Sequence, residues 1–206
     1  MKDIKECANL YKQLLNKSYT FKLENDIEFT IHFNSSNFFH LIGLHKLTDL
    51  ERITNNSKSV IFKKILKGDI SQKYIEKSDY YKKIVNRIKY FENILDMFDI
   101  NKTKIIVDFD PLLLDFDSEL QYTKYILYKK LDNGCTHTTI GQENEKLYAE
   151  TFFYDPTYHY LSEQDLLNIE SITVIDRKKY NNVNLNNNNK SLNDAAVGWL
   201  FYWNNI

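Results

Sequence analysis

The chain has 206 residues, a formal net charge of −1, and only two cysteines, two prolines and five glycines. This length suffices for one hydrophobic core, and the plentiful Leu, Ile, Phe and Tyr favour regular elements over disorder. The near-neutral charge excludes binding to nucleic acid through a general positive field, so any such contact must be local. Cys7 and Cys135 stand in no spaced metal motif, which disfavours a disulfide framework and a zinc ribbon.

The two ends of the chain differ in character. The first fifteen residues mix charges into helical spacing, and no later run is long enough to span a bilayer, so we expect a cytoplasmic protein without membrane contact. We expect one domain over residues 1–180, an Asn-rich linker over 181–190 and an apolar segment over 191–206. The aromatic stretch from Trp199 to Trp203 is expected to pack against protein surface, because its exposure would create a sticky patch.

The first half of the chain is predominantly helical in its periodicity. Residues 2–16 place apolar side chains at spacings of three and four, which predicts an amphipathic helix. Alternating apolar residues around Glu24-Asn25-Asp26 then predict a β-hairpin over 19–33, with His32 on its more polar face. Helical periodicity returns over 34–53, where Gly43 disfavours one unbroken helix, and continues over 58–67, 71–77 and 79–98. Such helices are expected to form a layer that covers a sheet.

The second half alternates in the manner of β-strands. Strands are expected over 104–109, 122–131, 135–141, 146–154 and 171–179, with a short helix at Ser162–Leu167. Because short turns separate successive strands, the pattern predicts an antiparallel meander. The predicted fold class is therefore α+β.

One hairpin of this meander has a strong turn signal. Asn133-Gly134 favours a type I′ turn, in which both central residues have positive φ. This turn would place Lys130 opposite His137 and Tyr128 opposite Thr139. Side chains alternate across a sheet, so these four would share the open face, opposite a buried face of Leu127, Leu131 and Ile140. A one-residue slip would flip this assignment.

The next strand would complete a set of chemically useful side chains. If Leu147, Ala149, Thr151 and Phe153 face the core, then Tyr148, Glu150 and Phe152 join the open face. In metal-free RNA cleavage the ribose hydroxyl attacks the adjacent phosphate, which requires a base, an acid and donors to the phosphorane. His137 and Glu150 would exchange protons, Lys130 and Thr139 would hold phosphate, and the substrate would contact Tyr128, Lys124 and Phe152. The alternative interpretation is an ordinary solvated sheet face.

Two groups of motifs resemble a known family. The segment NFFHLIGLHKL at 37–47, followed by YILYKKL, THTTIG, YAETFF and SITVIDR, resembles the predicted phage nucleases of the Barnase, EndoU, colicin and RelE-like superfamily, fourth phage subgroup. The resemblance covers roughly residues 20–178 and implies a helical N-terminal half packed on a curved antiparallel sheet. It also implies metal-independent RNase chemistry involving His137 and Thr139, together with His45 and Lys46. The implied partners are an RNA, whether free RNA, transfer RNA or RNA bound to the ribosome, and an inhibitor protein. The implied context is a phage or a toxin system.

Three other interpretations stay open. Since His40 and His45 lie about 140° apart around a helix, a zinc site formed by them with His137 is disfavoured. The alternating Asp108, Asp110, Asp115 and Asp117 suggest a metal-dependent nuclease, although such spacing more commonly marks an exposed loop. We therefore expect neither metal nor cofactor. The rival from another class is a non-catalytic protein of the same fold that binds a protein or an RNA.

Overall fold

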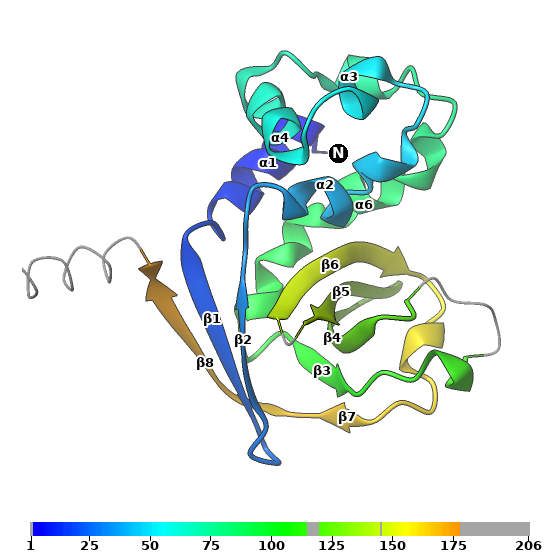
Figure 1. The fold of residues 1–206 in the computed structure, drawn as a ribbon. Coiled ribbons are helices and arrows are strands. Elements are labelled where there is room, and N and C mark those ends of the chain that lie inside the picture. The colour runs from blue at the N-terminus through cyan, green and yellow to red at the C-terminus, as the bar shows by residue number, and fades with distance from the viewer. Residues whose placement is uncertain (1, 115–119, 145, 178–206) are drawn as a thin grey trace, which may run out of the picture. The chain divides into compact units, whose positions relative to one another are not determined.

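The structure is a computed structural model that describes residues 2–114, 120–144 and 146–177 (Figure 1). The described residues up to 174 belong to one compact unit. The predicted linker and the predicted packing of Trp199 to Trp203 lie outside the described residues. Within the described ranges, no helix combines the length and the apolar character needed to cross a membrane.

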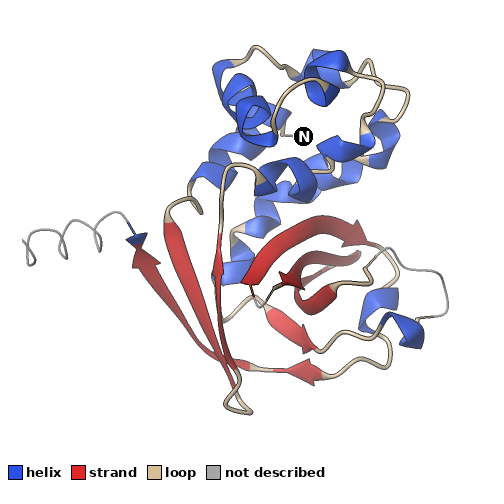
Figure 2. Cartoon of the chain, viewed as in Figure 1, coloured by secondary structure: helices blue, strands red, loops and turns tan. Residues whose placement is uncertain are grey.

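The helices gather beside the strands in this unit (Figure 2). The first helix, α1 (Ile4–Lys12), starts at a capping box in which the Asp3 carboxylate accepts from the Glu6 amide and the Glu6 carboxylate accepts from the Asp3 amide, both at 2.8 Å. The other helical elements are α2 (Asn37–Leu41), η1 (Leu44–Lys46), α3 (Glu51–Thr54), α4 (Lys58–Lys67), α5 (Gln72–Ile75), η2 (Tyr81–Lys83), α6 (Val85–Tyr90), η3 (Phe91–Ile94), η4 (Asp96–Phe98), η5 (Pro111–Leu113) and η6 (His159–Leu161).

The helical predictions are confirmed for the short segments and corrected for the long one. Helix α4 has the predicted bounds 58–67 and ends at Gly68, whose φ is 90°. The segment 79–98 is broken into η2, α6, η3 and η4. Its apolar stripe is nevertheless buried in the main core, and its members include Ile84, Ile88, Phe91 and Ile94. Packing against the core therefore outweighs the intrinsic preference for one continuous helix.

The strands divide into two sheets, where the sequence predicted one curved sheet. The first has the order β2-β1-β8 and the second the order β6-β5-β4-β3-β7. Their bounds are β1 (Lys17–Leu23), β2 (Glu28–His32), β3 (Lys104–Val107), β4 (Thr123–Leu131), β5 (Gly134–Glu143), β6 (Lys146–Asp155), β7 (Leu166–Leu167) and β8 (Ile169–Asp176). The antiparallel meander of β3 to β6 is confirmed. The predicted helix at Ser162–Leu167 is wrong, because Leu166 and Leu167 pair with β3 instead.

The β4–β5 hairpin is confirmed, but its predicted register is wrong. Leu131 pairs with Gly134, so the turn residues are Asp132 and Asn133. Of Asp132, Asn133 and Gly134, only Gly134 has a positive φ, at 113°. A type I′ turn needs a positive φ at both central residues, and Asp132 and Asn133 lack it. A Cβ on Gly134 would lie 2.4 Å from the Asp155 carbonyl oxygen, so the glycine is required where the strands approach each other.

This shift changes the partners of the predicted site residues. His137 pairs with Tyr128 rather than with Lys130, and Lys130 pairs with Cys135. The turn lies one residue earlier in the chain than predicted, which shifts the pairing by two residues. Because side chains alternate with a period of two, Tyr128, Lys130 and His137 still share one face of the sheet. That face is not open. Tyr128 belongs to a second apolar cluster with Ile106, Phe109, Leu120 and Ile126, against which Leu114, Phe153, Tyr160 and Leu161 pack.

A bulge changes the assignment of faces on β6. Thr138 pairs with Phe152 and Ile140 with Ala149, so one more residue lies between the partners on β6 than on β5. Ala149 and Phe152 consequently both enter the main core, at 1% and 0% exposure. The prediction that Phe152 shares an open face with Tyr148 and Glu150 is therefore wrong.

Gly43 lies between α2 and η1 and leaves room for a contact between the helical layer and β6. Its φ is 85°, and a Cβ there would lie 2.8 Å from Ile84 Cγ2 and 2.9 Å from Arg87 Cδ. The Arg87 guanidinium donates to the His40 carbonyl at 3.4 Å and to the Thr151 hydroxyl on β6. The glycine thus leaves room for the Arg87 side chain to run past the end of α2 and reach the sheet.

We expect Gly43→Ala to lower the free energy of unfolding by roughly 2 kcal/mol or more, because it adds steric overlap with Ile84 and Arg87 to the strain of positive φ. Urea unfolding measures this loss. Gly68→Ala is the matched control, since its φ is 90° but its nearest neighbour, Lys5 Nζ, lies at 3.9 Å. Equal losses in the two variants would contradict the steric account.

Candidate functional site

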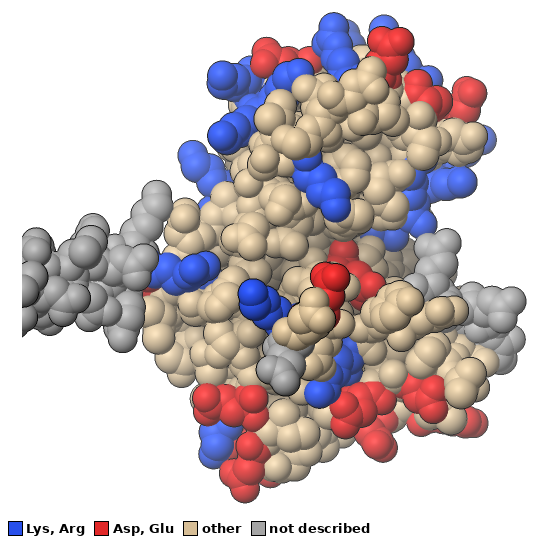
Figure 3. Space-filling view, in the orientation of Figure 1, with Lys and Arg blue, Asp and Glu red and all other residues tan. Residues whose placement is uncertain are grey.

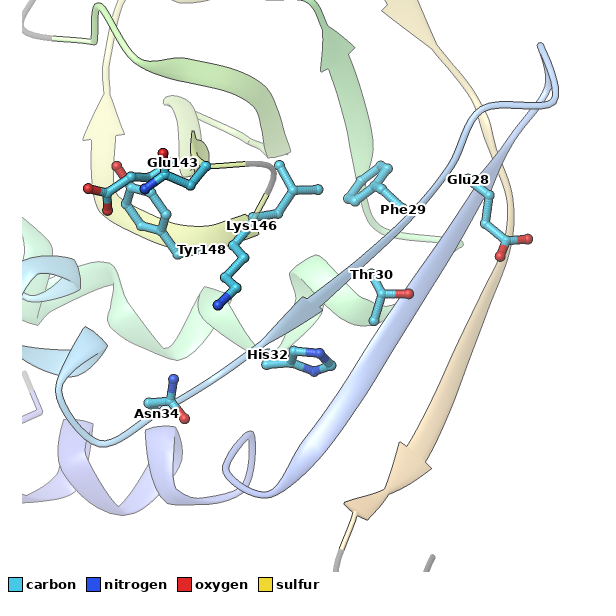
Figure 4. Close-up of a pocket in the computed structure, with 10 residues that line it drawn as sticks. Glu28, Phe29, Thr30, His32, Asn34, Glu143, Lys146 and Tyr148 are labelled. Carbon is cyan, nitrogen blue, oxygen red and sulfur yellow. The ribbon is translucent and has the colours of Figure 1, made fainter.

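A groove of about 880 Å³ lies between β2 and the turn that joins β5 to β6 (Figure 4). Its volume falls in the range of about 300–1,000 Å³ that is usual for ligand sites. The polar residues that line it come from both sheets and from the chain next to them: Glu28, Thr30, His32, Asn34, Glu143, Asn144, Lys146 and Tyr148. Phe29 and Leu147 add apolar surface.

The side chains of β2 are alternately buried and exposed, and this alternation places His32 in the groove. Phe29 and Ile31 point into the main core, at 7% and 0% exposure, and Thr30 and His32 therefore point away from it. Phe29 is held by stacking on Tyr125, with ring centroids 4.3 Å apart and an interplanar angle of 7°. His32 thus projects from a strand that the core holds in place.

The opposite wall of the groove carries a lysine and a tyrosine. Lys146 is exposed and extends from β6 toward β2, where His32 and Asn34 lie (Figure 4). Tyr148 is half-buried, and its ring covers Gly141, where a Cβ would come within 2.9 Å of it. Burial raises the pKa of Tyr148, as do the neighbouring charges of Glu150 and Glu143. The phenol is therefore protonated at neutral pH and can donate a hydrogen bond.

Next to Tyr148, the structure brings two of the predicted site residues together. The Glu150 carboxylate accepts a hydrogen bond from the Thr139 hydroxyl at 3.1 Å and another from the Thr123 hydroxyl at 2.6 Å. The Thr139 hydroxyl also accepts from the Thr151 amide at 3.1 Å, which satisfies a backbone donor at the bulge. These bonds connect β4, β5 and β6 and fix the Glu150 carboxylate beside the groove.

The other predicted site residues do not converge with these. His137 and Phe152 are fully buried, as is Thr139 itself, and Tyr128 is 3% exposed. Lys130 is exposed near the β4–β5 turn, and the half-buried Lys124 lies at the start of β4. His45 lines a second cavity, of about 560 Å³, that Lys58 also lines. Lys46 is half-buried in η1.

His137 lies instead in a buried cluster with Cys135 and Asp155. Its Nε2 is 3.0 Å from the Cys135 Sγ and 3.7 Å from an Asp155 carboxylate oxygen. Burial lowers the pKa of His137 and raises that of Cys135 to about 12. Burial would also raise the pKa of Asp155, but hydrogen bonds from His137 and Thr157 outweigh it and hold this pKa well below its usual range.

The metal alternatives can be compared with this arrangement. Among the described residues, Cys135, His137 and Asp155 form the one group of His, Cys, Asp and Glu close enough to share an ion. The imidazole rings of His40 and His45 lie 5.0 Å apart, but His137 does not join them. Of the alternating aspartates, Asp110 caps η5, with its carboxylate accepting from the Leu112 amide at 2.8 Å, while 115 and 117 lie outside the described residues.

Three groove residues, His32, Lys146 and Tyr148, were not singled out together from the sequence. The polar face of the first hairpin already contained His32, and Tyr148 shared the expected face of Glu150. The sequence does not show that β2 and β6, two edge strands more than one hundred residues apart, contact each other. No local pattern specifies such a contact.

We expect His137→Ala to lower the free energy of unfolding by roughly 3 kcal/mol, because it empties a buried site where the ring stacks on Phe153 at 4.8 Å. Urea unfolding of the variant and of the native chain measures the loss. The exposed His159 provides the control, since its truncation should change stability by no more than about 0.5 kcal/mol. A native stability in His137→Ala would contradict the packing described above.

Comparison with known proteins identifies the family. A family model described as phage-Barnase-EndoU-ColicinE5/D-RelE like nuclease 4 matches residues 3–193. Neither a curated protein nor a solved structure matches the chain. Because the match covers nearly the whole chain, from α1 through all eight strands, the chain belongs to this family of nuclease-like proteins.

Proposed function

We propose that the chain is an endoribonuclease that cleaves RNA without a divalent metal, and that the scissile phosphate binds in the groove between β2 and the β5–β6 turn. The observation that carries this proposal is the meeting of His32, Lys146 and Tyr148 around one cavity, from two different sheets. Membership of the nuclease family supports a nucleic acid substrate. The attacking group is the ribose 2′-hydroxyl, so the products carry a cyclic phosphate.

Each of the three side chains suits one need of this reaction. An imidazole such as that of His32 can take the proton of the hydroxyl near neutral pH. The Lys146 ammonium can stabilise the charge that develops on the phosphorane. The protonated Tyr148 phenol can donate to the phosphate or to the leaving oxygen. Glu150 does not line the groove, and its carboxylate is held by the Thr139 and Thr123 hydroxyls.

The charge around the groove favours local binding of a single strand. The helical segment 34–98 contains 12 Lys and Arg against 7 Asp and Glu, and on the face in Figure 3 these cations predominate over the helical part. Glu28 and Glu143 line the groove itself and oppose a long phosphate backbone. The half-buried Leu147 offers apolar surface to one splayed base. RNA, free or ribosome-bound, remains the predicted substrate, and an inhibitor protein the predicted partner.

His137 has a structural role in this proposal. Its full burial keeps it from touching RNA, and the same holds for Thr139. The predicted contribution of Lys130, Lys124, His45 and Lys46 is reduced to binding of the RNA backbone outside the groove.

We expect His32→Ala and Lys146→Ala each to reduce the rate of RNA cleavage by about 10²-fold or more, since each removes a group that acts on the transition state. Cleavage of a labelled RNA, with and without chelator during the assay, gives the rates and shows whether the ends are cyclic phosphates. Native rates in both variants, or an RNA that stays intact with and without ribosomes, would refute the proposal.

Matched controls separate these effects from general charge and folding. His159→Ala removes an exposed histidine, and Lys12→Ala an exposed lysine of α1 outside the basic segment 34–98, and neither residue lines the groove. Both should cleave at the native rate. RNA that is bound by the native chain but not cut would instead favour the non-catalytic interaction protein.

Tyr148→Phe tests the phenol alone. The ring still packs on Gly141, so the free energy of unfolding should change by less than about 1 kcal/mol. The turnover rate should fall by roughly tenfold or more, because the donor is lost from the groove. Urea unfolding and steady-state cleavage rates, measured on the same preparation, test the expected stability and the expected turnover rate. An unchanged turnover rate would remove Tyr148 from the proposed machinery.

A further inference from the structure

The buried cluster of Cys135, His137 and Asp155 is not used by the proposed nuclease reaction. None of the three lines the groove. Their exposures are 0%, 0% and 4%, and one potential ligand atom from each lies within 4.8 Å of the other two. Cys135 and His137 come from alternate positions of β5, and Asp155 ends the neighbouring strand β6. The sheet thus brings a thiol, an imidazole and a carboxylate to one buried point.

The spacing of these atoms suits a tetrahedral ion. With Zn–S near 2.3 Å and Zn–N or Zn–O near 2.0–2.2 Å, the ligand atoms of a tetrahedral zinc lie roughly 3.3–3.6 Å apart. In the cluster, His137 Nε2 lies 3.0 Å from the Cys135 Sγ and 3.7 Å from the Asp155 Oδ2. Shifts of a few tenths of an ångström would therefore bring both pairs to the spacing of a zinc centre. The third pair, the thiol and the carboxylate, lies within 4.8 Å, so binding would draw these two atoms together by up to roughly 1.2 Å.

The charges of the cluster also suit a divalent cation. The Asp155 carboxylate is buried, and among the described residues no Lys or Arg pairs with it. Its surroundings are aromatic, with the His137 ring stacked on Phe153 and 5.7 Å from Tyr160. A buried carboxylate is costly without a cation. One thiolate and one carboxylate would neutralise one Zn²⁺.

The remaining bonds of the cluster orient it in the manner of a ligand shell. Asp155 Oδ1 accepts from the Thr157 amide at 2.8 Å and from the Thr157 hydroxyl at 2.7 Å, while Oδ2 accepts from the Tyr160 amide at 3.4 Å and lies 3.7 Å from His137 Nε2. Within the described part of the chain, the polar contacts of His137 are made by Nε2, on the side of the thiol and the carboxylate. Carboxylate ligands of metals are commonly fixed by such second bonds.

We propose that Cys135, His137 and Asp155 bind one Zn²⁺ that joins β5 to the end of β6. Binding displaces the thiol proton of Cys135 to solvent, and water supplies the fourth ligand, as in other sites with three protein ligands. Catalytic zinc sites share this pattern of three protein ligands and one water, but a substrate cannot reach this buried cluster. The ion would therefore act structurally and hold the edge strand β6 where the chain leaves the sheet toward η6.

The test measures metal in the full chain, purified without a histidine tag from cells grown with added zinc. We expect about one zinc per chain by mass spectrometry, and about one cobalt after exchange, with a thiolate-to-cobalt absorption band. The chain has only two cysteines, so the band must come from Cys135 if it persists in Cys7→Ser. Cys7 is a suitable control, because it is buried elsewhere and its thiol contacts the Ile88 carbonyl.

These outcomes test the zinc site independently of RNA cleavage. A band that persists in Cys7→Ser and disappears in Cys135→Ser, with loss of zinc in Asp155→Asn, supports the site. A native chain that contains no zinc and gives no cobalt band overturns it, and the cluster is then a hydrogen-bonded triad only. Zinc that stays at the native level in Cys135→Ser also overturns it. Because Cys7→Ser alone assigns the band, misfolding of the Cys135 variant does not impair the test.

Discussion

The double covering of the five-stranded sheet is the constraint on which the rest of the structure depends. One face packs into the main core through residues such as Leu127, Ile140 and Phe152. The other face is covered by a second cluster that includes Tyr128 and Ile126. Apolar burial contributes about 25 cal/mol per Å², so closing the second face stabilises the meander but removes the open surface on which a catalytic set could lie. Functional side chains must then come from the edges.

The groove forms where two such edges meet. β2 is the outer strand of the three-stranded sheet and β6 the outer strand of the five-stranded sheet. An edge strand has no pairing partner on one side, so another element can approach it there. His32 on β2 and Lys146 and Tyr148 on β6 face the groove in this way. The main core fixes both strands, since Phe29 and Ala149 are buried in it.

The histidines show how environment assigns different roles to one residue type. His137 is buried, its pKa is lowered by burial, and its polar contacts are with Cys135 and Asp155. His32 lies in a groove where a ligand can reach it. Burial thus suits His137 to structural bonding or to metal binding, while partial exposure suits His32 to proton transfer. The same distinction separates the buried Thr139 from the groove residue Thr30.

The sequence by itself determined the α+β class, helix α4, both hairpins and the meander, because periodicity and turn residues are local properties. It also determined that Lys130 and His137 share a face, since alternation along a strand survives a register shift. The tertiary structure alone decided that this face is covered, because the covering residues Leu120 and Tyr160 belong to the connections between predicted strands. It alone brought β2 beside β6, since a contact between edge strands far apart in the chain depends on how both sheets pack on the shared core.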